Sequence, residues 1–569
     1  MFIETTRLIR AALQAVTGEE DVLIADGGEH ADLASTVAFP LAKKRRAPPA
    51  SIAAELASRL APTLAPHGIA VEATGPYLNF RFGLPYFAGA IRAALAPGYG
   101  AGEPQEARVV LEHTSANPNG PLHVGHIRNS IIGDTLARAF RKAGYPTEVQ
   151  YYVNDMGRQI AIVVWGMEHL GFEPDAGEKP DHFIARVYVE ANRRIEADPA
   201  ITAEIDGLMQ RVEALDPATV RAFRNVVARC LDGFRETLGD LATPHDRFVW
   251  ESDFLRNGDM ERVLSRLSRL PVAHQEEVFY LDLSGAGIEN RYVLRRSDGT
   301  SVYAARDLAY HLWKGRNFDR VIDVLGADHK LIGAQLQATL SLIGELPPEI
   351  VHFEFVSLPE GSMSTRAGTF IAADDLIAET RRRAFEEVTV RRPELPEEER
   401  RAIAQSVALA AIRYDIIRIS PEKSTVFDWK TALDFERQSG PYIQYAHARA
   451  CSILEKAGGF TETFAAESPY EQALVRQIAK FPAVVAQAVA ELRPHLVATY
   501  ARELADLFNT FYHYEPVLRA EGEMRDARLT LVLAAQNTLR EALGTLGTLG
   551  TLRITWNGGH RSRGSRGPP

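Results

Sequence analysis

The distribution of apolar and polar residues divides the chain into stretches with different periods. Residues 5–16 and 49–64 carry apolar side chains at helical spacing, whereas residues 77–82 alternate as a β-strand does. The turn-rich segment 96–100, with one proline and two glycines, closes this part of the chain. We therefore predict a small α/β domain over residues 1–100.

A second pattern begins at residue 101. A short apolar run at 108–112 leads into a loop rich in proline, asparagine and glycine at 115–121. A helical pattern at 125–143 and another strand-like run at 148–153 follow. The order strand, loop, helix, strand is a βαβ unit, which implies a parallel sheet with its ligand at the carboxyl ends of the strands.

Strand-like runs return at 277–283, 320–325 and 350–358, so we predict a Rossmann-type catalytic domain over residues 101–371. Residues 156–270 have mainly helical periodicity. We expect them to form an insertion that interrupts the sheet rather than extending it.

The remainder of the chain is predicted to be helical. Residues 372–430 suit a helical stem, and residues 431–552 suit an all-α bundle, because both are amphipathic and rich in Ala, Leu, Arg and Glu. The end repeats Gly-Thr-Leu and then becomes rich in Arg and Gly, a composition that cannot form a packed core. We predict disorder for residues 553–569.

Composition limits the class of protein. With 569 residues, 46% hydrophobic and 24% charged, the chain is long enough for several domains. No uninterrupted apolar run approaches the roughly 20 residues that cross a bilayer, so we expect a cytoplasmic protein without a membrane partner. Only Cys230 and Cys451 occur, without metal-ligand spacing, so we expect no zinc, no other bound metal and no tightly bound cofactor.

The candidate chemistry starts at His123, Gly125 and His126, where the first loop of the βαβ unit enters its helix. The N-terminus of a helix attracts anions, and two imidazoles there could stabilise charge on a phosphoryl group under attack. In isolation, a core histidine pair or a metal pair explains these residues equally well. Their place after a strand, in a Pro/Asn/Gly loop, favours a phosphate site.

The segment Glu112 to Asn129, with its His-Val-Gly-His, resembles the first signature of class I aminoacyl-tRNA synthetases in the long form of arginyl-tRNA synthetases. This resemblance implies ATP-dependent activation of an amino acid and its transfer to tRNA, with His123, His126 and Arg366 as catalytic residues. It implies that ATP, with Mg²⁺, contacts Ala116, Asn117, Pro118, Asn119, Gly120, Pro121, Leu122, His123, Val124, Gly125, His126, His329, Met363 and Ser364. Residues 152–159 and 326–329 also look like family segments that line the site.

Residues 362–368 resemble the second, flexible signature of the same class but depart from it. Ser362 stands where a lysine is expected, and Gly120 occupies about the place where some family members carry a substitute lysine. The cation that neutralises pyrophosphate is then expected to be Arg366, Arg128 or magnesium.

Recognition of arginine needs carboxylates that can pair with a guanidinium. Tyr303 and Asp307 lie four residues apart and would share one helix face. The resemblance implies that Glu112, Tyr303 and Asp307 bind the arginine side chain and that Ser115 and Asn117 hold its main-chain groups. For Asp307 the simpler alternative is a surface ion pair.

The tRNA contacts implied by the resemblance fall in two domains. Tyr442, Tyr445 and Arg449 resemble the helix that opens the anticodon-binding bundle, and Tyr77 and Asn79 belong to the segment that touches the tRNA elbow. Core packing is the alternative in both places.

Together these features predict an arginine–tRNA ligase that uses ATP, L-arginine and tRNA(Arg) and functions as a monomer. Two alternatives remain open: a class I synthetase for another amino acid, such as cysteine, and an inactive tRNA-binding paralogue. Missing zinc-ligand cysteines count against the first, and the intact His123, His126, Glu112 and Asp307 count against the second.

Overall fold

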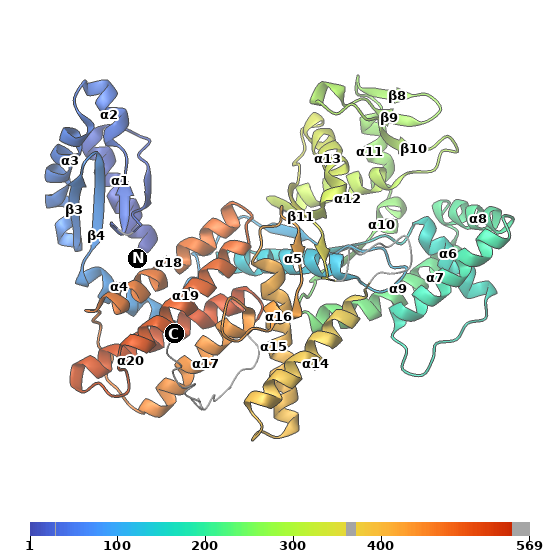
Figure 1. The fold of residues 1–569 in the computed structure, drawn as a ribbon. Coiled ribbons are helices and arrows are strands. Elements are labelled where there is room, and N and C mark those ends of the chain that lie inside the picture. Colours follow the sequence, from blue (N-terminus) through green and yellow to red (C-terminus); the bar gives the residue numbers. More distant parts are fainter. Residues whose placement is uncertain (29, 360–370, 549–569) are drawn as a thin grey trace, which may run out of the picture.

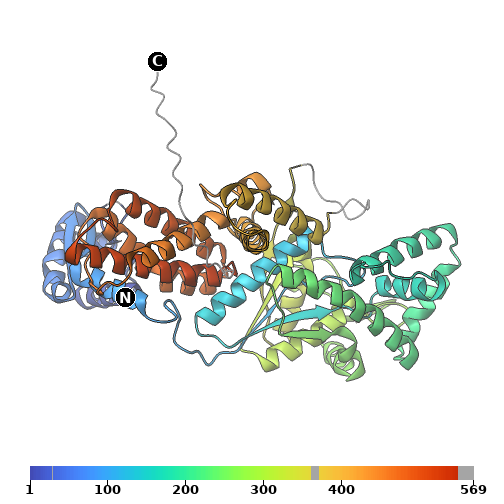
Figure 2. The same cartoon turned by 90° about the horizontal axis from the view of Figure 1, so that it is seen from below.

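The computed structural model describes residues 1–28, 30–359 and 371–548. Met363, Ser364 and Arg366 of the second signature lie outside these residues, as does the predicted tail at 553–569. Figures 1 and 2 show an elongated molecule, with a small N-terminal domain at one end, a helical arm at the other and a sheet between them.

The N-terminal domain is the predicted α/β unit. Its sheet has the order β1-β2-β4-β3, and every neighbouring pair is antiparallel. The strands are β1 (Ile24–Asp26), β2 (Leu33–Ser35), β3 (Ile69–Thr74) and β4 (Tyr77–Phe82), and the helices are α1 (Phe2–Thr17), α2 (Ala38–Arg45) and α3 (Pro49–Leu64). Helix α4 (Leu84–Leu95) follows this sheet and packs against the C-terminal helices α18 (Pro469–Ala490) and α20 (Gly522–Thr545).

The central sheet is parallel throughout, with the order β12-β11-β5-β6-β7. Its strands are β5 (Val109–Glu112), β6 (Thr147–Val153), β7 (Arg247–Trp250), β11 (Arg320–Gly326) and β12 (Glu349–Phe353). Helix α5 (Val124–Lys142) connects β5 to β6, which confirms the predicted βαβ unit. The register places Glu112 between Asp323 and Gln150 on the adjacent strands, so three polar side chains meet near the carboxyl edge.

Three strand predictions need correction. Residues 247–250, predicted to belong to an insertion that only interrupts the sheet, form its edge strand β7. The run 277–283 contributes β9 (Phe279–Leu281) to a separate antiparallel sheet with β8 (Ala273–Gln275) and β10 (Tyr292–Arg295). The run 350–358 divides into β12 and β13 (Val356–Ser357), and β13 pairs with β14 (Thr425–Val426). Periodicity identifies an extended run, but it does not specify the partner strand.

The rest of the predicted insertion is a helical arm. It contains α6 (Arg158–His169), α7 (Pro180–Ala197), α8 (Ile201–Glu213) and α9 (Pro217–Asp240), which extend from the sheet in Figure 1. The arm is tied to the helix that follows the second signature, because Lys179 Nζ and His182 Nε2 each lie 2.8 Å from Asp374. Helices α10 (Glu251–Arg256), α11 (Asp259–Leu267), α12 (Tyr303–Asn317) and α13 (Lys330–Leu342) pack near the sheet.

The C-terminal part is helical, as predicted. It comprises α14 (Ala373–Arg391), α15 (Glu397–Ile417), α16 (Trp429–Ala432), α17 (Gly440–Ala457), α18 (Pro469–Ala490), α19 (His495–Tyr514) and α20 (Gly522–Thr545). Ser468 and Glu471 form a reciprocal capping box that starts α18. Helix α18 is long and apolar enough to cross a membrane by length and composition, and half of that window is buried against the bundle, as in the core helix of a soluble protein.

A buried arginine joins the stem to the catalytic domain. Arg413 of α15 is fully buried, and its guanidinium contacts the Asp134 carboxylate of α5 at 2.5 Å. It also donates hydrogen bonds to the backbone carbonyls of Leu241 and Leu546. The stem, the catalytic domain and the end of the bundle are thereby held by one side chain.

Candidate active site

The two signature histidines form the first turn of α5. His123 is the N-cap: its Nδ1 accepts the N–H of Gly125 at 3.1 Å, and Nδ1 of His126 accepts the N–H of His123 at 3.2 Å. The rings stack with their centroids 3.7 Å apart. A Cβ at position 125 would lie 2.9 Å from the His123 ring, which explains the glycine between them.

These contacts fix the protonation of both rings. Burial lowers the pKa of His123, and burial followed by the neighbouring His123 lowers the pKa of His126 well below its usual value, so both are neutral at pH 7. A neutral ring whose Nδ1 accepts a hydrogen bond carries its proton on Nε2. Both rings therefore present an Nε2–H donor beside the positive end of a helix dipole, an arrangement suited to phosphate.

A cavity of about 450 Å³ lies beside this turn, at the carboxyl edge of the central sheet. It is lined by the predicted Ser115, Ala116, Asn117, His123, Gly125, His126, Tyr303 and His329, and by Thr114, Asn129, Tyr152, Asn154, Gly326, Asp328, Ile332, Phe353 and Phe355. Phe353 ends β12, Phe355 lies two residues beyond it, and Ile332 lies in α13. All three are far from the first signature in sequence, so no local pattern identified them.

The remaining residues predicted to contact ATP in the first signature lie outside this lining. Leu122 and Val124 are buried, and Gly120 faces the arm, because a Cβ there would lie 3.2 Å from the Cβ of Ala185. Pro118, Asn119 and Pro121 also belong to the loop but not to the lining. The backbone of Leu122 accepts the N–H of Ala373 at 2.7 Å, which attaches the loop to the start of α14.

Arg128, one of three candidates for the missing cation, does not fill that role. Its side chain is buried and donates hydrogen bonds to five backbone carbonyl oxygens, those of Glu354, Phe355, Ser420, Pro421 and Lys423. Burial lowers its pKa to about 10, so it remains charged, but the charge is used in joining α5 to the segments around β13 and β14. The prediction that Arg128 could neutralise pyrophosphate is wrong.

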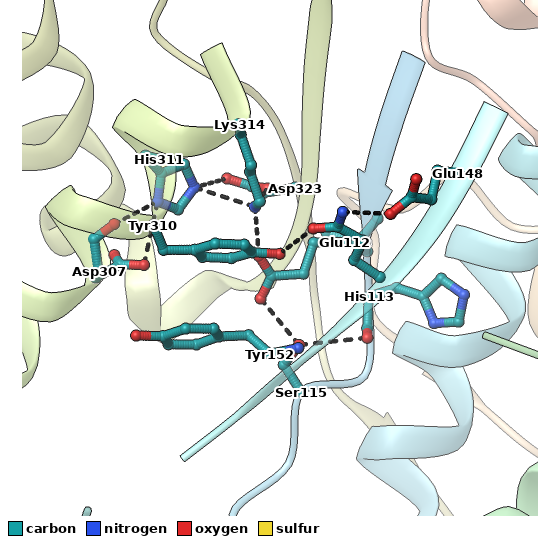
Figure 3. Close-up of polar contacts among 12 residues, drawn as sticks. Glu112, His113, Ser115, Glu148, Tyr152, Asp307, Tyr310, His311, Lys314 and Asp323 are labelled. Atoms are coloured by element: carbon teal, nitrogen blue, oxygen red, sulfur yellow. Dashed lines mark hydrogen bonds and ion pairs between the residues drawn. The ribbon is translucent and has the colours of Figure 1, made fainter. Parts of the chain in front are cut away.

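Of the residues predicted to recognise the arginine side chain, Tyr303 and Asp307 lie in the first two turns of α12, and Glu112 ends β5. Figure 3 shows Asp307 and Glu112. Tyr303 lines the cavity and Asp307, one turn later, is buried with an oxygen 3.1 Å from Nδ1 of His311. The shared helix face is thus confirmed, and Asp307 is not a surface residue. The hydroxyls of Tyr152 and Tyr292 are buried without a hydrogen-bond partner in the described part of the chain. Burial raises the pKa of both hydroxyls, and the negative charge of Asp307 raises it further.

Glu112 is already paired within the protein. Its Oε2 lies 2.5 Å from the ammonium of Lys314, and its Oε1 accepts a hydrogen bond from Ser115 Oγ at 2.8 Å. Sequence reasoning missed Lys314, although its spacing from His311 and Asp307 places all three on one face of α12. A lysine in the last turn of a helix is usually a solvated residue that complements the dipole.

Ser115 and Asn117 support neighbouring segments. Ser115 Oγ accepts the N–H of Tyr152 at 3.0 Å, and its backbone adopts a left-handed φ of 36°, which is costly for a residue with a Cβ. Asn117 accepts a hydrogen bond from Asn154 at 3.2 Å at the mouth of the cavity. His329, at the carboxyl end of β11, is half exposed and lies 3.1 Å from Asp328.

Three family models match the chain in succession. The model described as arginyl tRNA synthetase N terminal domain matches residues 4–82, that of tRNA synthetases class I (R), catalytic domain, matches 92–429, and the DALR anticodon binding domain matches 443–549. The chain belongs to the class I arginyl-tRNA synthetases. The alternative of a synthetase for cysteine has no support in these matches.

Individual relatives of this arginyl-tRNA synthetase agree over nearly the whole length. An arginine–tRNA ligase of Methanosphaerula palustris is 66% identical over 96% of this chain and 99% of its own, and one of Methanospirillum hungatei is also 66% identical over 96% and 99%. The arginyl-tRNA synthetase structure of Thermus thermophilus has a TM-score of 0.84 at 31% identity, covering 95% of this chain and 98% of that one.

The residues predicted to touch tRNA differ in exposure. Tyr77 is exposed and packs edge-on against Phe39, whereas Asn79 is buried and donates a hydrogen bond to Thr74 at 3.0 Å. The core-strand alternative therefore describes Asn79, and Tyr77 remains available on the surface of the synthetase.

On the bundle, the three predicted residues form one partly exposed surface of α17 against α19. The guanidinium of Arg449 lies 4.4 Å from the ring centroid of Tyr445 and 5.9 Å from that of Tyr512. The hydroxyl of Tyr442 donates to Asp506 at 2.8 Å and accepts from Asn509 at 3.0 Å. Tyr442 is therefore anchored, and Tyr445 with Arg449 forms the part suited to stacking and phosphate contact.

Proposed function

We propose that this synthetase forms arginyl-adenylate from ATP and L-arginine in the cavity beside α5 and then passes the arginyl group to tRNA(Arg). The observation that carries the proposal is the chemistry at the two ends of the site. Two neutral imidazoles with their protons on Nε2 line the cavity at the start of α5, and Asp307 provides a buried carboxylate one turn after Tyr303. Phosphate donors and a guanidinium acceptor are what the reaction needs.

For the phosphates, His123 and His126 are proposed to donate hydrogen bonds as charge develops when the arginine carboxylate attacks the α-phosphorus. ATP enters as its magnesium complex. His329, at the end of β11, is placed to contact the adenosine part. The assignments of Arg366, Met363 and Ser364 are retained as proposals from the sequence alone.

For arginine, the guanidinium is proposed to pair with Asp307 and to donate hydrogen bonds to the hydroxyl oxygens of Tyr303, Tyr152 and Tyr292. The buried unpartnered hydroxyls support this placement, because a buried polar group without a partner is costly unless a ligand supplies one. Asn117 and Ser115 would hold the substrate's main-chain groups. Glu112 would contribute to binding of the arginine side chain while its carboxylate remains paired with Lys314.

For tRNA, the proposal uses both ends of the molecule. Tyr445 and Arg449 on α17 would contact anticodon bases and backbone, and Tyr77 on β4 would contact the elbow, with Asn79 as its structural support. The domain limits 1–100, 101–371, 372–430 and 431–552 are proposed as functional units, acting in a cytoplasmic monomer.

The test is ATP–pyrophosphate exchange with each of the twenty amino acids, with and without tRNA(Arg). We expect exchange with arginine alone, and only when tRNA is present, because the family typically needs tRNA to form the adenylate. Exchange with another amino acid would contradict the pocket assignment. No exchange under any condition would favour the inactive tRNA-binding paralogue.

A further inference from the structure

Five ionisable side chains form a closed cluster beneath the arginine end of the cavity (Figure 3). They are Glu112 of β5, Asp323 of β11, and Asp307, His311 and Lys314 of α12, and all are buried. The parallel register sets Glu112 and Asp323 side by side, and α12 supplies the other three from one face. Sequence reasoning assigned only Glu112 and Asp307.

The contacts assign a charge to each member. Lys314 Nζ lies 2.5 Å from Glu112 and 2.8 Å from Asp323, so an ammonium is held between two carboxylates. His311 has acceptors at both nitrogens: Nε2 lies 2.7 Å from Asp323, and Nδ1 lies 2.9 Å from the carbonyl oxygen of Asp307 and 3.1 Å from its carboxylate. Lys314 Nζ also lies 3.3 Å from Nε2, so that nitrogen has both an acceptor and a cation beside it. Because each nitrogen has an acceptor within hydrogen-bond distance, we assign the ring as an imidazolium.

The pKa values of His311 and Lys314 agree with that geometry, whereas that of Glu112 is shifted by burial in the opposite sense. Burial and Lys314 act to lower the pKa of His311, but Asp323 and Asp307 outweigh them and raise it to about 10. Burial likewise opposes the charge of Lys314, yet Asp323 and Glu112 raise its pKa. Burial raises the pKa of Glu112, and the ammonium of Lys314 opposes that rise.

The ammonium of Lys314 between Glu112 and Asp323 favours their ionised forms. With the three carboxylates ionised, they face two cations, and the cluster carries one surplus negative charge. Of the tyrosines beside the cluster, Tyr310 is fully buried and neutral, because burial raises its pKa well above 10, and Tyr303 is 41% exposed. The next charged group is Arg306, which pairs with the buried Glu251 and with Glu213.

A divalent metal is the obvious competitor for this cluster, because ligand atoms of Glu112, His311 and Asp323 lie within 4.8 Å of one another. The ammonium of Lys314 already contacts both carboxylates, and both nitrogens of His311 face acceptors. Lys314 thus fills the position that a metal ion would take.

We propose that Lys314 sets the charge of the arginine pocket, leaving a single negative charge that one guanidinium cancels. Without the ammonium of Lys314, the site would bury two surplus negative charges and would take up protons instead of substrate. With it, a neutral isostere such as citrulline leaves the surplus carboxylate uncompensated and is rejected. The inference rests on the proposed binding of the guanidinium at Asp307.

The test restores the charge count by a second substitution. Asp323→Asn lowers the surplus to zero, so KM for arginine in tRNA-dependent exchange should rise about ten-fold or more while the inhibition constant of citrulline changes little. Lys314→Met together with Asp323→Asn returns the surplus to one, and KM for arginine should return to within about three-fold of wild type. Circular dichroism and melting would check the fold of each variant.

The control is Arg316→Met combined with Asp323→Asn. Arg316 lies on the same helix but is exposed, 3.8 Å from Glu345, so removing its charge should give no recovery. If the Lys314→Met double variant is no better than Asp323→Asn alone, Lys314 acts as a packing residue and the inference fails. If wild type itself does not exchange with arginine, the proposed function fails instead.

A measurement on the unaltered enzyme covers the case in which the variants do not fold. Arginine binding followed by calorimetry at pH 7.5, in buffers with different ionisation enthalpies, should show uptake or release of nearly no protons, because all five groups keep their charge. Transfer of about one proton per site would overturn the charge assignment. Citrulline should bind at least about ten-fold more weakly than arginine in the same experiment, and equal affinity would also overturn it.

Discussion

Nδ1 of His126 accepts the backbone N–H of His123, 3.2 Å away, and this one contact decides which nitrogen of the His126 ring carries the proton. Because Nδ1 is occupied, the proton resides on Nε2 and the neutral ring can donate to a phosphate oxygen. The geometry of the cap and the chemistry of the site are set by the same hydrogen bond.

Replacement of His126 by Ala should therefore affect the rate more than substrate binding. We expect kcat for tRNA-dependent exchange to fall by about 10²–10³-fold, the usual result of removing one donor to a transition-state oxyanion. KM for arginine should change by less than about three-fold. A large rise in KM for arginine with unchanged kcat would place His126 in amino-acid binding.

Replacement of Asp307 by Asn should have the opposite kinetic signature. The carboxylate that we propose to pair with the guanidinium is lost while the helix is kept, so KM for arginine should rise about 10²-fold, with KM for ATP within about three-fold of wild type. Tyr303→Phe, which leaves the carboxylate, is the matched comparison and should have a smaller effect. Unchanged arginine dependence in Asp307→Asn would remove Asp307 from the pocket.

Buried histidines should make the protein sensitive to acid. Burial lowers the pKa of His245 and of His447 to about 4, each from an ordinary value near 6.5. As pH falls from 6.5 towards 4, the unfolded chain binds protons that the folded chain does not, so the free energy of unfolding should fall. The slope is at most about 1.4 kcal/mol per pH unit for each histidine. Urea unfolding between pH 7 and pH 5 measures it.

His311 should impose the opposite slope on the alkaline side. Its pKa is raised to about 10, so the folded chain retains a proton that the unfolded chain releases above pH 6.5. Stability from this group is complete below pH 6.5 and is lost as pH rises towards 10. His311→Gln should flatten the decline in urea midpoint between pH 7 and pH 9; an unchanged decline would mean that His311 is not charged in the folded protein.

Loss of the buried Arg413 should destabilise the whole molecule. Arg413→Met leaves the buried Asp134 with only the partly exposed Arg138 as ion-pair partner and removes the donor to the carbonyl oxygens of Leu241 and Leu546, at a cost of up to about 3–5 kcal/mol. The melting temperature should drop by several degrees. Arg413→Met with Asp134→Asn should recover part of the loss, whereas equal stability of single variant and wild type would show that the pair contributes nothing.

The parts of the site that sequence could predict are those built from local order. A strand, a loop and a helix in succession predict β5, α5 and the place of His123 and His126, and a spacing of four predicts the shared face of Tyr303 and Asp307. These features need only periodicity and the direction of the chain. The fold class followed from the same signals, and the family matches confirm it.

What the sequence could not supply depends on partners far along the chain. The four residues of β7 are too few to show a period, and their place at the sheet edge depends on β6. In sequence, Lys314 looks like a solvated lysine at the end of a helix. Its buried role depends on the contact with Glu112, which lies 202 positions earlier in the chain. Arg128 reads as a surface cation beside the signature, yet five carbonyl oxygens surround it.

That enclosure of Arg128 has a consequence for communication along the molecule. Helix α5 begins with the histidines proposed to handle phosphate, and farther along it is joined to the stem by two buried arginines, Arg128 through carbonyls near β14 and Arg413 through Asp134. If tRNA binding to the bundle displaced the stem, α5 would move with it, and so would the turn that carries His123 and His126. The stem and the signature histidines are thus connected through a single helix, α5, with no hinge between them.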